Sequence, residues 1–98
     1  MIKVSISKDH IEITGHAMFD DYGKDIVCAS FSSIVITSLN AILRLDSKSI
    51  KYDVHSGSLN VYILKHDDVT DKLISNMIMM IKELKEKYDK NIQVNEEV

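Results

Sequence analysis

Hydrophobic and polar residues alternate in two short segments at the start of the chain. Isoleucine or valine occupies every second position of residues 2–6, and Ile11 and Ile13 continue the pattern after the polar pair Lys8-Asp9. Such alternation is typical of a strand with one buried face, because successive side chains of a strand point to opposite sides. The pattern predicts an antiparallel hairpin with a tight turn at Lys8-Asp9.

The same alternation returns in the second half of the chain. Residues 50–54 and residues 59–63 place an apolar side chain at every second position, and a short stretch ending in Gly57 separates them. Because glycine tolerates the backbone conformations of tight turns, this arrangement predicts a second hairpin. Residues 92–94 alternate once more and allow a short final strand.

The periodicity becomes helical between the two hairpins. Apolar residues follow one another closely from Ile26 to Leu43 and would surround most of a helix, which predicts deep burial. We expect Asp25 to cap this helix, since its carboxylate can accept hydrogen bonds from the N–H groups of the first turn. Asp46 marks its end.

A second helical pattern follows the second hairpin. Apolar residues recur at spacings of three and four within residues 73–88, with lysine and glutamate between them. This spacing predicts an amphipathic helix with one core-facing stripe that includes either Met80 or Ile81. Asp67 and Asp68 are both suitable N-cap residues for it.

The predicted order is strand-strand-helix-strand-strand-helix, with a short C-terminal strand allowed. This order predicts a two-layer α+β sandwich, in which a mainly antiparallel or mixed sheet carries both helices on one face. The length fits a single domain, residues 1–98. A chain of this size buries only about 65 % of its unfolded surface, so sharing core surface in a dimer would help.

Composition narrows the classes of partner. The net charge is −3 and the lysines are scattered, which argues against direct binding of nucleic acid. We expect no membrane segment, because no apolar run approaches the roughly 18 residues required. A single cysteine and the lack of an export signal favour a cytoplasmic setting. No phosphate-binding glycine loop or dinucleotide motif is present, so no cofactor is expected.

The candidate chemistry centres on Cys28, the only cysteine, which would be the third residue of the first helix. A helix N-terminus and a nearby imidazole lower the pKa of a thiol, and His16 at the end of the second strand could accept its proton. Gly15 would permit a sharp exit from the sheet there. Each residue of this pair also has a structural interpretation. Cys28 could be a buried cysteine that behaves as a small hydrophobic residue, and His16 could be hydrogen-bonded to a loop carbonyl.

Two further residues could support this pair. Ser32 lies four residues after Cys28, hence on the same helical face, and could bond the thiol, the imidazole, a substrate carbonyl or its own backbone. Asp25 could orient His16, although capping the helix explains it equally well. A zinc site built from His16, Cys28 and a carboxylate would lack the usual ligand number, so no metal is expected.

The combined spacing resembles the ribosomal-processing cysteine protease family, Prp. The motif covers about twenty residues, while length and element order resemble the family over essentially the whole chain. The residues that carry the resemblance are Gly15-His16-Ala17, Gly23 at the end of a six-residue loop, Asp25-Ile26-Val27-Cys28-Ala29 and Ser32.

The resemblance implies a small cytoplasmic, homodimeric endopeptidase that removes a short N-terminal extension from the large-subunit ribosomal protein L-twenty-seven. It further implies that Cys28 is the nucleophile and His16 the base, with Asp25 and Ser32 in support. Gly15 and Gly23 would shape the intervening loop. Two other functions stay open: a non-catalytic module that binds a ribosomal protein, and a phage-type protease that processes capsid or scaffold protein.

Overall fold

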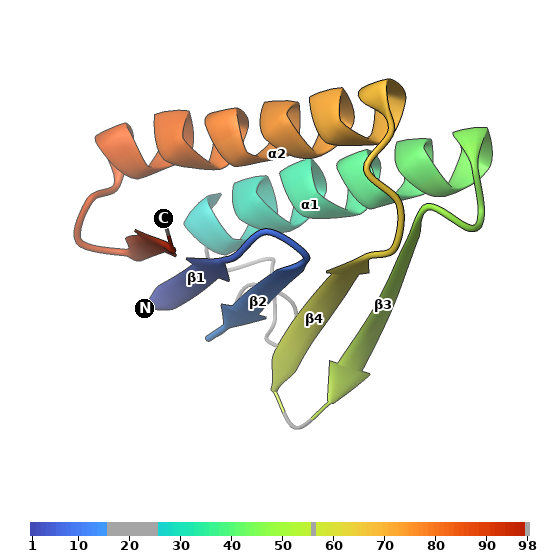
Figure 1. Ribbon diagram of the computed structural model, residues 1–98. Coiled ribbons are helices and arrows are strands. Elements are labelled where there is room, and N and C mark those ends of the chain that lie inside the picture. Colours follow the sequence, from blue (N-terminus) through green and yellow to red (C-terminus); the bar gives the residue numbers. More distant parts are fainter. Residues whose placement is uncertain (16–25, 56, 98) are drawn as a thin grey trace.

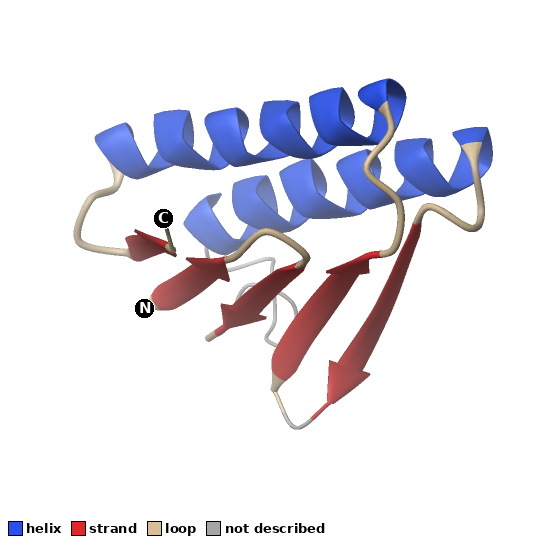
Figure 2. Ribbon diagram, viewed as in Figure 1, coloured by secondary structure: helices blue, strands red, loops and turns tan. Residues whose placement is uncertain are grey.

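The computed structural model describes residues 1–15, 26–55 and 57–97. Within them, one sheet carries two helices on the same face, which confirms the predicted two-layer α+β architecture (Figures 1 and 2). The elements are β1 (Ile2–Ile6), β2 (His10–Thr14), α1 (Ile26–Leu45), β3 (Ile50–His55), β4 (Ser58–Ile63), α2 (Asp68–Lys87) and β5 (Ile92–Glu96).

The strands follow the order β3-β4-β2-β1-β5. Both predicted hairpins are present, and β2 pairs with β4 to join them, so these four strands are antiparallel. The allowed final strand is confirmed as β5, which pairs in parallel with β1 and brings Ile92 opposite Ile2. The sheet is therefore mixed, because α2 carries the chain back across it before β5.

The core lies between the sheet and the helices. Alternate residues of the strands point toward the helices, as the period-two pattern predicts, and Ile11, Ile13 and Val61 are at most 1 % exposed. Tyr52 and Val54 share that face but are exposed, and they belong to β3, the strand at one edge of the sheet. Figure 1 shows that the β3–β4 hairpin extends beyond the helices.

Helix α1 is buried along one side only, so the prediction that it is deeply buried around most of its circumference was wrong. Phe31 and Val35 are completely buried, whereas Ile36 is 44 % and Ile26 75 % exposed. The physical reason is that the sheet and α2 cover only part of the circumference, as Figure 1 shows. The exposed side also carries small polar residues such as Thr37, which the sequence pattern contained but the apolar run obscured.

The same helix corrects a second expectation. Residues Ile26–Leu45 are long and apolar enough to cross a membrane, by length and composition alone. The statement that no run approaches this length was therefore wrong. In the structure the buried side of this helix packs within the core of the domain, and core helices of compact proteins meet the same criterion.

Helix α2 follows its predicted pattern. Asp67 is the N-cap, and its side chain accepts a hydrogen bond of 2.8 Å from the backbone N–H of Thr70. Ile81 rather than Met80 belongs to the core stripe, since Ile81 is fully buried while Met80 is 40 % exposed. The helix ends at Lys87.

Candidate active site

Cys28 is the third residue of α1, as predicted, because the helix begins at Ile26. The first four N–H groups of any helix have no partner within it, and their dipoles favour negative charge at that end. Cys28 is 5 % exposed and lies in the core cluster with Val27 and Phe31. This burial fits both a small hydrophobic residue and a thiol shielded from solvent, so burial alone does not assign a role to Cys28.

Ser32 follows Cys28 by one helical turn and is equally buried. Residues four apart in a helix are neighbours on its surface, so the two side chains share the face that points into the domain. The next residue, Ser33, is exposed instead. The predicted pairing of Cys28 and Ser32 on one face is therefore confirmed.

Gly15 forms a bend directly after β2. Its φ is +109°, a region that side-chain-bearing residues rarely adopt, and a Cβ atom there would lie 2.5 Å from the carbonyl oxygen of Met1. The glycine thus lets the chain bend directly after β2 while the backbone of Met1 comes close.

His16, Gly23 and Asp25 lie outside the described residues. Their predicted roles as base, loop-shaping residue and supporting residue stay predictions.

Two described histidines lie on the opposite face of the sheet from α1. His10 precedes the buried Ile11 and therefore points outward, where its Nε2 is 2.9 Å from Asn60 Oδ1 and its ring stacks on Tyr62. His55 alternates with the inward positions of β3 and is exposed. Neither can serve a thiol on the helix side of the sheet.

His66 is also occupied elsewhere. Both of its ring nitrogens bond carboxylates, Nδ1 to Asp71 at 2.9 Å and Nε2 to Asp9 at 2.5 Å. It follows Lys65, whose partner Asp46 directly follows α1, and about 25 Å of helical rise separates Cys28 from that end of α1. The sequence gives no local sign of these contacts, because Asp9 is 57 positions from His66 and Asp71 belongs to the next element.

The described part of the chain contains no group of three or more histidine, cysteine or acidic side chains that could hold a metal ion.

The family model described as "Cysteine protease Prp" matches residues 1–93. The chain belongs to this family. The resemblance inferred from the residues around Cys28 is thereby confirmed. The chain is a member of the ribosomal-processing cysteine proteases.

Curated Prp relatives match most of the chain. The ribosomal processing cysteine protease Prp of Staphylococcus aureus is 33 % identical over 84 residues, covering 83 % of this chain and 79 % of the relative. That of Mycoplasma pneumoniae is 33 % identical over 85 residues, covering 87 % and 81 %.

Solved Prp structures share the fold. The S. aureus protease with a covalently linked product peptide superposes with a TM-score of 0.88 at 27 % identity, covering 99 % of this chain and all of that one. The same protease with a substrate peptide gives 0.85 at 26 % identity, with the same coverage. The S. aureus protease thus holds a peptide in both structures, and in one of them the peptide is covalently linked.

Proposed function

We propose that this protein is an endopeptidase that removes a short N-terminal extension from a large-subunit ribosomal protein of the L-twenty-seven type during ribosome assembly. One observation carries the proposal: a chain of a cysteine protease family contains a single cysteine, and that residue occupies the first turn of α1. A cysteine protease needs a thiolate nucleophile. Cys28 is then the nucleophile.

His16 is the proposed base. The three described histidines are directed elsewhere, two of them across the sheet and His66 between two carboxylates. His16 directly follows the bend at Gly15. An imidazole can take the thiol proton and later return it to the departing amine, which is the pair of proton transfers that this reaction needs.

The proposed reaction has two stages. The Cys28 thiolate attacks the scissile carbonyl carbon, and the N–H groups at the start of α1 stabilise the negative charge on the carbonyl oxygen. His16 protonates the leaving amine as the C–N bond breaks, which leaves a thioester. Water then attacks the thioester, releases the carboxylic acid and restores the thiol.

Asp25 and Ser32 are proposed as supporting residues. Ser32 is suited to this because its buried hydroxyl lies one turn from Cys28 on the same face. Asp25 directly precedes the first helical residue, a position from which a carboxylate can cap the helix or orient an imidazole. Gly23, like Gly15, would shape the segment that precedes them.

We further propose a cytoplasmic homodimer. The domain is small, and large apolar side chains including Ile36, Val54 and Met79 remain exposed on it. Sedimentation equilibrium tests the oligomeric state, and a monomer at micromolar concentration would contradict it.

The decisive experiment incubates the purified protein with the precursor of the ribosomal protein and with capsid and scaffold proteins, followed by mass spectrometry. We expect one new N-terminus in the ribosomal protein and none after Cys28→Ala or His16→Ala. His55→Ala is the matched control for histidine removal, since His55 is exposed on the other face of the sheet, and it should retain activity.

The burial of Cys28 favours one alternative, a non-catalytic module that binds the ribosomal protein. Thiol labelling distinguishes the two functions. Rapid alkylation of Cys28 by iodoacetamide well below pH 8 indicates an activated thiolate, whereas an inert thiol that co-purifies with intact precursor supports the binding module. Cleavage of capsid or scaffold protein alone would favour the phage-type protease.

A further inference from the structure

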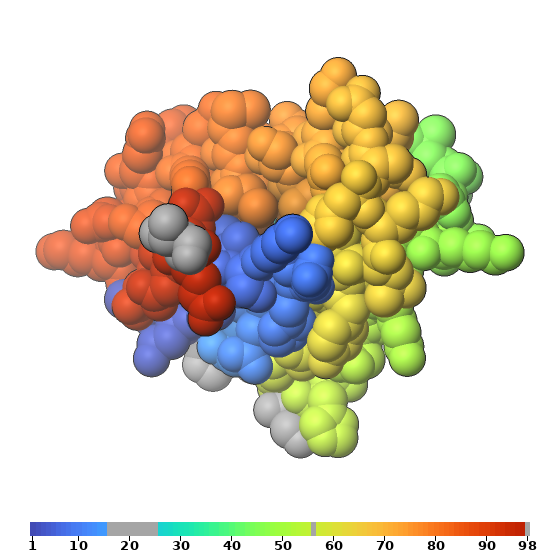
Figure 3. Space-filling view, in the orientation of Figure 1, coloured from blue at the N-terminus to red at the C-terminus, as the bar shows by residue number. Residues whose placement is uncertain are grey.

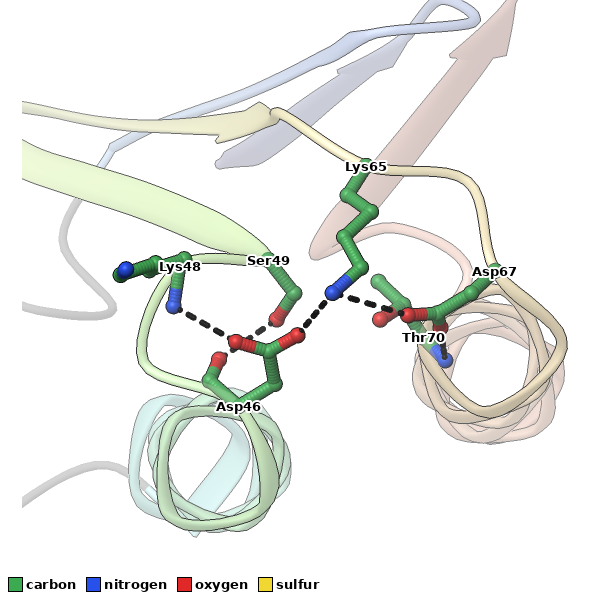
Figure 4. Close-up of polar contacts among 6 residues, drawn as sticks. All are labelled: Asp46, Lys48, Ser49, Lys65, Asp67 and Thr70. Atoms are coloured by element: carbon green, nitrogen blue, oxygen red, sulfur yellow. Dashed lines mark hydrogen bonds and ion pairs between the residues drawn. The ribbon is translucent and has the colours of Figure 1, made fainter.

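Two consecutive residues of the segment between β4 and α2 each bridge two carboxylates. Lys65 binds Asp46, which directly follows α1, and lies 3.7 Å from the N-cap Asp67 (Figure 4). His66 bonds Asp9 of the β1–β2 turn and Asp71 in the first turn of α2. Three separate parts of the chain thus meet at one end of the domain.

We propose that Asp9, His66 and Asp71 form a pH-dependent clasp, which fastens the β1–β2 turn to α2 when the imidazole is protonated and releases it when the imidazole is neutral. This device is independent of the proposed cleavage reaction. It lies at the opposite end of α1 from Cys28, so its state and the chemistry of the thiol are separable.

The geometry of the imidazole requires this behaviour. An ionised carboxylate can only accept hydrogen bonds, and a neutral imidazole has a single N–H to donate. Nδ1 is 2.9 Å from Asp71 Oδ1 and Nε2 is 2.5 Å from Asp9 Oδ1, so both bonds form together only when both nitrogens carry hydrogen. Loss of the proton leaves one lone pair facing a carboxylate, and one of the two bonds must break.

The other charged side chains near His66 have partners of their own, so Asp9 and Asp71 are the groups that control the protonation of its imidazole. The bond to Asp9 and then the bond to Asp71 raise the pKa of His66 above its ordinary value, while partial burial opposes the rise. Lys65 and Asp67 are engaged with each other, and Asp68 faces Lys72 at 3.2 Å. Asp46 is bound to Lys65.

The turn that the clasp holds is also part of the sheet. The carbonyl of Asp9 accepts a hydrogen bond of 2.8 Å from the N–H of Ile63, and the N–H of Ser7 donates to the carbonyl of His10 at 2.8 Å. In Figure 3 the yellow surface of the residues after β4 lies directly against the blue surface of the first hairpin. Release of His66 is therefore expected to loosen the end of β4 together with the turn.

The sign of the pH effect follows from the raised pKa. The stabilisation is fully present below the unfolded-state value, about 6.5 for histidine, and is lost as the pH rises through the higher folded-state value. The clasp is thus closed in mildly acidic conditions and opens toward alkaline pH.

NMR titration of the histidine rings tests the proposal in the intact protein. We expect the pKa of His66 to lie above the ordinary histidine value of about 6.5, and both Asp9→Asn and Asp71→Asn to lower it. Asp68→Asn is the matched control, since it removes one negative charge from the same helical turn without removing a bond to His66.

Hydrogen exchange supplies a second readout. We expect the protection factor of the Ile63 amide, corrected for the intrinsic exchange rate, to fall severalfold as the pH rises through the pKa of His66, and to lose this dependence in His66→Gln. The proposal is overturned if the pKa of His66 is not above the ordinary histidine value, or if Asp9→Asn and Asp71→Asn shift it no more than Asp68→Asn does. Retained cleavage in these variants would leave the proposed function unaffected.

Discussion

Gly15 and Met1 approach so closely that a single added carbon at Gly15 would lie 2.5 Å from the Met1 carbonyl oxygen. Gly57 shares the positive φ of Gly15, at 78° against 109°, but has no atom within 4 Å of the same position. A substitution at Gly57 therefore tests backbone strain alone, whereas the same substitution at Gly15 adds steric overlap.

Gly15→Ala should therefore destabilise the fold more than Gly57→Ala. Strain alone costs about 1–2 kcal/mol in either case, and Gly15→Ala must also displace the backbone of Met1. Urea denaturation of both variants measures the difference. Equal free energies of unfolding would show that the contact with Met1 relaxes without cost.

Gly15→Ala should also reduce peptide cleavage, because Gly15 directly precedes His16, the proposed base. We expect Gly57→Ala to keep its activity, since Gly57 lies in the distant β3–β4 turn. Normal cleavage by folded Gly15→Ala would contradict a positioning role for this glycine.

Ser32→Ala should lower kcat/KM about tenfold, because it removes a buried hydroxyl one helical turn from Cys28. The protein should stay folded, since loss of a typical hydrogen bond costs only about 1 kcal/mol of stability. Ser33→Ala makes the same chemical change on the exposed side of α1 and should be neutral. Steady-state cleavage of the extension peptide provides the comparison. If both variants cleave like the wild type, Ser32 has no supporting role.

Phe31→Ala and Ile36→Ala test the one-sided burial of α1. Phe31 is fully buried, so its truncation should cost about 3–5 kcal/mol, whereas truncation of the 44 % exposed Ile36 should cost less than about 1 kcal/mol. Free energies of unfolding from urea titration measure both. Similar losses would mean that the exposed side of α1 is covered in solution, as in a dimer that uses this helix.

The N-cap of α2 predicts a loss of stability in acid. Hydrogen bonds from the backbone and side chain of Thr70 hold the pKa of Asp67 below its ordinary value of 3.8. Its contribution is present above the unfolded-state pKa and is lost as the pH falls through the lower folded-state pKa.

Asp67→Asn tests this effect, because asparagine also caps helices but does not titrate. We expect the melting temperature of the variant to fall less steeply below pH 4 than that of the wild type. Asp68→Asn, which leaves the cap intact, should retain the steep fall. If the melting temperature falls equally steeply with pH in all three proteins, Asp67 is not the cause of the loss of stability in acid.

Local pattern was sufficient for most elements of the fold. Each hairpin could be predicted because apolar and polar residues alternate along its strands, and the cap of the second helix could be narrowed to Asp67 or Asp68 from their position before an apolar stripe. The parallel pairing of Ile2 with Ile92 could not, since strand order depends on contacts across the whole chain. Burial of α1 was overestimated because Ile26 and Ile36 are apolar yet exposed. The sequence alone does not distinguish an apolar residue on the surface from one in the core.

The site was only partly accessible to the same reasoning. Cys28, Ser32 and Gly15 could be placed because helix spacing and glycine chemistry are local. The clasp was missed because Asp9 is 57 positions from His66, and no local pattern links the two.

The pairing of the first strand with the last has a consequence for biosynthesis. Ile2, Cys28 and Ile92 belong to one core cluster, so the hydrophobic environment of the cysteine is incomplete until β5 has left the translating ribosome. The nascent protein should therefore acquire its native sheet only after β5 has emerged, which pulse proteolysis of stalled chains with β5 still inside the ribosome or already outside it would reveal.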